Sequence, residues 1–185
     1  MTRNLYGLSV APVLAWCIRN AARFAVPCTT IPRRRSVFFA NAYGVQLRRG
    51  DLLALHASGA DWRDDQIRDS ALRVREAMDT SVPTHPEPYR ALAGRVVAVA
   101  TLTTCISRPP PVRDGGPPDP WCSEALRDLW RQSGGHWWCV LEDVRALPAL
   151  VECPGNVGVW SVPYHVTVAT MDQVRALEGR TKGAA

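Results

Sequence analysis

Apolar residues recur at helical spacing in one long stretch of the chain, and this pattern predicts the clearest helix, over Asp61–Asp79. Asp61 is positioned to cap the start of this helix. Weaker patterns predict a short helix or turn over Leu8–Ile18, a helix over Ser123–Gln132, and a final helix from Thr170 through Leu177. The residues that form the apolar face of the long helix are Ile67, Ala71, Val74 and Met78.

Other apolar runs are too short or too β-branched for helices and predict strands. The run RVVAVATLTTC, residues 95–105, is rich in Val and Thr and apolar in both phases, which is typical of a buried strand. A second strand is expected over Asp51–Leu55. Closing strands are expected in residues 136–144 and 156–169, joined through the link 145–155. Short strands with helices between them, without regular alternation, indicate an α+β domain around a small barrel.

The remaining segments favour loops. Residues 107–120 hold six prolines and two glycines, so we expect an exposed loop or mobile insertion there. Arg33–Arg49 is basic and loop-like, with a short apolar run at Val37–Ala40. We therefore expect one domain over residues 5–165 and a C-terminal strand or helix over 166–185, whose last residues, from Gly179, fray.

Composition describes an ordinary globular protein with a basic surplus. The hydrophobic fraction is 46%, the charged fraction 21% and the formal net charge +5, which favours anionic partners slightly. None of the six cysteines lies in a CxxC pair, and most stand in apolar runs, where a free thiol behaves as a small hydrophobe. No apolar run approaches the roughly 20 residues of a membrane span, and we see no signal peptide. We expect a cytoplasmic protein that has no contact with membranes.

The order of the segments resembles the ASCH family, a branch of the PUA-like barrels. Four stretches carry the resemblance: LSVAPVLAWCI, RRGDLLALHAS, GRVVAVATLTTC and HWWCVLEDVRALPALVECPGNVGVW. They span roughly residues 8 to 163. In this family the end of the second stretch borders a cleft, so the resemblance implies that His56 and Ser58 lie at its rim. The alternative is that His56 only satisfies backbone groups where its strand ends.

The chain departs from the family at its most distinctive motif. Where the family has a lysine, a glutamate and an arginine after the first helix, this chain has Arg23, Val26 and Cys28. Family members that hydrolyse an acylated cytidine are thought to need that lysine and a nearby acid. An arginine does not readily lose its proton, and a valine cannot accept one. We therefore expect no N4-acetylcytidine amidohydrolase activity and favour a binding protein over an enzyme.

Several side chains suit nucleic acid or a modified nucleotide, RNA more than DNA. Arginines neutralise phosphates, and aromatic side chains offer stacking faces to bases. Trp137 and Trp138 are neighbours on a predicted strand, so one of them faces away from the core. The candidate binding residues are Arg23, Arg33, Arg34, Arg35, Arg48, Arg49, His56, Ser58 and Trp138.

Two alternatives stay open, a hydrolase or ribonuclease acting on RNA or a nucleoside, and a protein-interaction module. A metal-free nuclease could use His56 with an arginine and a serine. The sequence has no GxSxG, P-loop, HExxH or dinucleotide motif, and its four histidines are scattered. We expect neither a metal nor a cofactor, and the oligomeric state is left undetermined.

Overall fold

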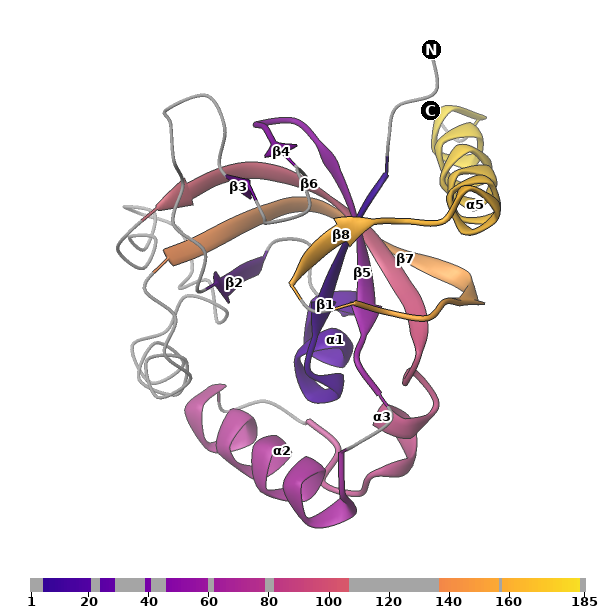
Figure 1. The fold of residues 1–185 in the computed structure, drawn as a ribbon. Coiled ribbons are helices and arrows are strands. Elements are labelled where there is room, and N and C mark those ends of the chain that lie inside the picture. Colours follow the sequence, from indigo (N-terminus) through magenta and orange to yellow (C-terminus); the bar gives the residue numbers. More distant parts are fainter. Residues whose placement is uncertain are drawn as a thin grey trace.

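The computed structural model describes residues 5–20, 24–28, 39–40, 46–59, 62–78, 82–106, 137–156 and 158–183. Its strands are β1 (Tyr6–Val10), β2 (Phe24–Cys28), β3 (Phe39–Ala40), β4 (Gln46–Leu47), β5 (Leu52–Ala57), β6 (Arg95–Ile106), β7 (Trp137–Glu152) and β8 (Val159–Ser161). Its helices are α1 (Pro12–Arg19), α2 (Asp64–Met78), α3 (Glu87–Arg90) and α5 (Tyr164–Gly183) (Figure 1).

Six of these strands form one mixed sheet in the order β2-β7-β6-β5-β1-β8, and β3 pairs with β4 in a small second sheet. Strands β1 and β5 run parallel, while the other neighbours in the large sheet are antiparallel. In the described part of the chain, β2 and β8 are the two edges of this sheet. The α+β class is therefore confirmed, whereas a closed barrel is not seen among these residues.

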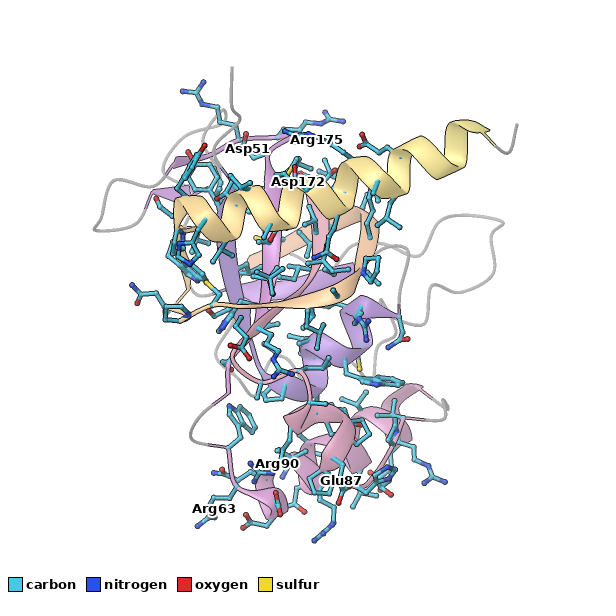
Figure 2. All side chains as sticks on the ribbon, turned by 90° about the vertical axis from the view of Figure 1, so that its right-hand side faces the viewer. Asp51, Arg63, Glu87, Arg90, Asp172 and Arg175 are labelled. Atoms are coloured by element: carbon cyan, nitrogen blue, oxygen red, sulfur yellow. The ribbon has the colours of Figure 1, made fainter. Side chains whose placement is uncertain are left out.

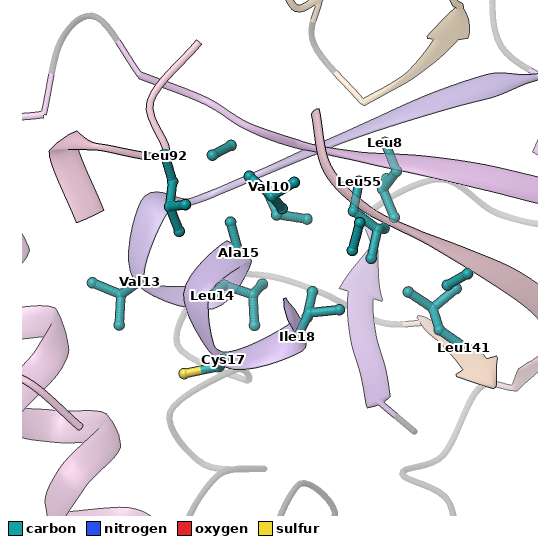
Figure 3. Packing of buried hydrophobic residues seen from close by; sticks show 14 of the residues in the cluster. Leu8, Val10, Val13, Leu14, Ala15, Cys17, Ile18, Leu55, Leu92 and Leu141 are labelled. Carbon is teal, nitrogen blue, oxygen red and sulfur yellow. The ribbon is translucent and has the colours of Figure 1, made fainter. Parts of the chain in front are cut away.

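The sheet separates two hydrophobic clusters, because successive side chains of a strand point to opposite faces. On β5, Leu53 and Leu55 pack in the cluster that contains α1, whereas Ala54 packs in the cluster that contains α5. Figure 3 shows the first cluster, where Ala15 and Ile18 of α1 lie among strand residues such as Leu55. Each face of the sheet thus has its own helix.

Strand β7 is one long strand that bulges where the sequence predicts a link. Between the pairs Val96↔Val151 and Ala98↔Ala146 of β6 and β7, β7 carries four residues opposite one of β6. Backbone groups that the bulge removes from the ladder find side-chain partners on both faces. The Leu147 carbonyl accepts from Arg19 Nη2 of α1 at 3.2 Å, and the Ala149 N–H donates to Gln173 Oε1 of α5 at 2.9 Å. The prediction of a link over 145–155 is therefore wrong for residues 145–152, which belong to β7.

Helix α5 corrects the prediction for the C-terminal region. The β-branched run at 156–169 suggests a strand, but only Val159–Ser161 is one, and the helix begins at Tyr164. The buried residues Val166, Thr170 and Val174 follow a four-residue spacing, so burial against the sheet selects the helix over local strand preference. The helix itself continues to Gly183, beyond Gly179, the residue from which the sequence predicts fraying.

The N-terminal half agrees better with the sequence pattern. Helix α2 buries Ile67, Ala71 and Val74 as predicted, but it begins at Asp64. The Ile67 N–H donates to the Arg63 carbonyl in its first turn, and Asp61, the predicted cap, lies outside the described residues. Strand β1 is absent from the predicted elements, because a helix or turn was expected from Leu8 onward.

Candidate functional site

Strand β5 carries predicted site residues at both of its ends. Arg48 and Arg49 precede the strand, whereas His56 lies near its end and Ser58 just after it. A strand rises about 3.3 Å per residue, so the four steps from Leu52 to His56 cover about 13 Å along β5, and both arginines precede Leu52. The structure therefore does not bring these arginines and His56 into one site.

At the carboxyl end of β5, His56 belongs to a buried polar network. His56 stands opposite Ser9 in the parallel β1–β5 pair, and only 3% of its surface is exposed. Its Nδ1 lies 3.2 Å from Ser9 Oγ, and its Nε2 lies 3.1 Å from the Cys153 carbonyl oxygen. Trp160 Nε1 lies 3.1 Å from the same Ser9 Oγ, and the Trp160 ring meets the imidazole edge to face.

The chemistry of these atoms sets the direction of each hydrogen bond when His56 is neutral. A carbonyl oxygen only accepts, so His56 Nε2 carries the proton and donates to Cys153. His56 Nδ1 is then an acceptor, which receives the hydroxyl proton of Ser9. The indole N–H of Trp160 donates to the Ser9 oxygen. The network is a chain of donors from Trp160 through Ser9 and His56 to the Cys153 backbone.

Two glycines leave the space that the network needs. A β-carbon on Gly155 would lie 2.0 Å from His56 Cε1, and one on Gly7 would lie 2.4 Å from Trp160 Cε2. Gly155 itself is exposed, so its backbone covers the imidazole on the solvent side. Burial lowers the pKa of His56 below its ordinary value, against the opposing effect of the hydrogen bond to Cys153. The environment thus favours the neutral imidazole.

These contacts agree with the alternative in which His56 satisfies backbone groups at a strand end. His56 also accepts a hydrogen bond from the side chain of Ser9. Ser58 likewise satisfies a backbone group, because both its N–H and its Oγ donate to the Val10 carbonyl at 2.9 Å. A serine hydroxyl bonded to an imidazole whose other nitrogen is held in place is also the arrangement of an activated nucleophile. Sequence reasoning missed Ser9, which stands 47 positions before His56 and is brought to it only by strand pairing.

At the amino end of β5, Arg48 and Arg49 are held on a tight turn. The Asp51 carboxylate accepts the Arg48 backbone N–H at 2.6 Å, and the Asp51 N–H donates to the Arg48 carbonyl. Gly50 has a φ of +88°, a conformation that favours glycine, and its N–H donates to Leu102 of β6. Asp51 is thus bonded to backbone, while both arginine side chains are exposed. The turn presents two guanidinium groups to solvent from a fixed backbone.

The other predicted site residues cannot be placed. Arg23, Arg33, Arg34 and Arg35 lie outside the described residues, as do the Trp138 side chain and the loop 107–120. Of the family-motif positions, Val26 and Cys28 have a described backbone in β2. Within the described ranges, no three His, Cys, Asp or Glu side chains are grouped to hold a metal, and no helix is long and apolar enough to cross a membrane.

No family model matches this sequence, and no curated protein matches it.

Proposed function

We propose that this protein binds nucleic acid or a modified nucleotide, with RNA favoured over DNA, and that the turn formed by Arg48–Asp51 holds phosphate groups. The observation that carries the proposal is the anchored turn itself. Asp51 bonds the Arg48 backbone, so the turn fixes the chain without using the guanidinium groups. Because the backbone of the turn is already fixed, phosphate binding has to order only the two arginine side chains, whose guanidinium groups form charge-assisted hydrogen bonds.

The charge of the chain and its resemblance support this proposal. A net charge of +5 raises the local concentration of polyanions around the protein. The resemblance to the ASCH family implies a PUA-like barrel, and we propose that the six-stranded sheet is part of one. Single-stranded RNA is the favoured ligand because its unstacked bases are open to side-chain contacts. We further propose a cytoplasmic location, in keeping with the free, buried thiols of Cys17 and Cys153.

Titration of labelled RNA and DNA oligomers at several salt concentrations tests the proposal. Each phosphate neutralised on a single strand contributes about −0.7 to the slope of log K against log salt. The double variant Arg48→Ala/Arg49→Ala should flatten that slope by about 1.4 and weaken binding at low salt. The matched control is Arg68→Ala/Arg73→Ala, which removes the same charge from the exposed face of α2 at the opposite end of the molecule (Figure 1).

The control variant should keep the wild-type slope, because α2 lies far from the turn. Equal flattening in both double variants would show that only net charge matters and that the turn is not a site. Absence of binding by the wild type at low salt would overturn the proposal. The exposed arginines would then be a solvated surface, and the protein-interaction module would become the leading function.

A second candidate is a metal-free hydrolase or ribonuclease, and the Ser9–His56 hydrogen bond favours it. His56 Nδ1 is placed to accept the Ser9 proton, and the Cys153 carbonyl holds the ring in the required tautomer. The test is turnover of RNA oligomers and of simple acyl esters by the wild type, Ser9→Ala and Val168→Ala. Turnover lost in Ser9→Ala but kept in Val168→Ala, an exposed position on α5, would establish the activity. Equal background in all three would assign the network to folding.

A further inference from the structure

Tyr164, the first residue of α5, is unusually exposed for its type. It leaves 77% of its surface in solvent, against 39% for Leu72 and 39% for Val168, the other large apolar side chains that are exposed in the described ranges. Two residues later, Val166 is fully buried, and the Thr167 N–H donates to the Pro163 carbonyl at 2.9 Å. The backbone under Tyr164 is therefore fixed, although its ring is not part of the core.

The sheet register places Tyr164 at the same end of the sheet as the arginine turn. Leu53 of β5 stands opposite Tyr6 of β1, and Tyr6 stands opposite Ser161 of β8. From these paired residues, β5 runs backward along the chain to Asp51, and β8, which is antiparallel to β1, runs forward to Tyr164. Asp51 and Tyr164 therefore lie beyond the same end of the strands. Strands β5 and β8 flank β1, and neighbouring strands are about 4.8 Å apart. The axes of β5 and β8 therefore lie about 10 Å apart across the sheet.

Figure 2 shows Asp51 in the upper part of the molecule, at about the height of Arg175 of α5. The first turn of α5 contains no acidic residue, so nothing in that turn repels a phosphate. An exposed aromatic ring and two exposed guanidinium groups thus lie at the same end of the sheet.

We propose that Tyr164 is a stacking platform for a base of a single-stranded nucleic acid whose phosphates lie on Arg48 and Arg49. This inference rests on the proposed function and names its ligand class and its base-contacting residue. Tyrosine offers a flat amphipathic ring that loses little conformational entropy on contact. A base in a duplex already has stacked neighbours, so only an unpaired base can lie on an isolated ring. The site therefore selects single strands over duplexes.

The test uses single-stranded oligomers that carry one 2-aminopurine, whose fluorescence is quenched by stacking, with affinity measured by anisotropy. Tyr164→Ala should weaken single-strand binding about 5- to 100-fold, as loss of one base stack does. The salt slope should stay at the wild-type value, since the phosphate contacts remain. Tyr164→Phe should keep both affinity and quenching, because the ring is retained. Val168→Ala, one turn further along α5, is the matched control for loss of an exposed apolar group.

The outcomes separate this inference from the proposed function. Single-strand binding by the wild type that is unchanged in Tyr164→Ala would overturn the stacking platform and leave the arginine turn standing. Duplexes bound as tightly as single strands would also overturn it. Absence of any binding by the wild type would overturn both proposals. Circular dichroism of the variants checks that α5 is intact, and an equal loss of affinity in Tyr164→Phe and Tyr164→Ala would contradict a role for the aromatic face.

Discussion

Gly155 lies so close to the imidazole of His56 that a β-carbon on it would stand 2.0 Å from Cε1 and 2.4 Å from Nδ1. The two residues are joined indirectly as well, because His56 Nε2 donates to the carbonyl of Cys153, two positions before Gly155. The segment that starts at Cys153 therefore covers the histidine and bonds to it. Its glycine is required by the close approach and not by a turn.

Gly155→Ala should destabilise the protein by about 1–3 kcal/mol, the usual cost of forcing extra volume into a packed site. The new methyl group must displace either the ring or the backbone that covers it. Urea denaturation provides the measurement. Gly179→Ala is the matched control, because Gly179 lies inside α5 with no atom within 4 Å of its β-carbon position. That control should stabilise the protein by about 0.5–1 kcal/mol, and equal destabilisation by both changes would contradict the packing argument.

Trp160 is 6% exposed and packs in the cluster on the α5 side of the sheet. Trp160→Ala should cost about 3–5 kcal/mol of unfolding free energy, as large-to-small core changes do. Gly7→Ala should also destabilise the wild type, because its β-carbon would lie 2.4 Å from Trp160 Cε2. In the Trp160→Ala background the same change should cost much less, so the two effects should not add. Additive free energies in this double-mutant cycle would refute the contact.

Stability should depend on pH through His56. Burial lowers its pKa in the folded state from the ordinary 6.5, so the unfolded chain binds the proton more readily. The stabilisation is therefore complete above about pH 6.5 and is lost as the pH falls through 6.5 toward the lowered folded-state value. The free energy of unfolding, measured by urea denaturation across this range, should decrease accordingly.

His56→Gln should remove most of this pH dependence, because glutamine does not titrate. His165→Gln, at an exposed position of α5, is the matched control for the histidine-to-glutamine substitution itself. A wild-type profile that is flat below pH 6.5 would mean that the imidazole is not held neutral by its surroundings.

The buried thiols should resist alkylation in the native protein. Burial raises the pKa of Cys17 to about 12 and also raises the pKa of Cys153, so neither forms the reactive thiolate near neutral pH. Cys139 is 1% exposed and should be protected by burial alone. Peptide mapping after iodoacetamide treatment should find these three sites unmodified before denaturation and modified after it. Rapid native labelling of Cys17 would show that α1 is not packed as described.

Elements with a strong local pattern could be predicted from the sequence. The periodic face of α2 and the apolar run of β6 each identify their own element, because burial on one face or on both follows a fixed spacing. The predicted strand at Asp51–Leu55 corresponds to β5. By contrast, the run at 156–169 is rich in Val, yet from Tyr164 onward it is helical, and Val166 and Val174 of this helix pack against the sheet.

By itself, the sequence determined the α+β class, the main helix and the central strands. It also placed Arg48 and Arg49 in a basic, loop-like segment before a strand. Only the tertiary structure decided that His56 is bonded to Ser9 and Cys153 at the opposite end of β5 from those arginines, and that Tyr164 lies at the arginines' end of the sheet. The physical reason is separation along the chain. Partners 47 and 97 positions from His56 meet it through strand pairing and a covering loop, which no local pattern encodes.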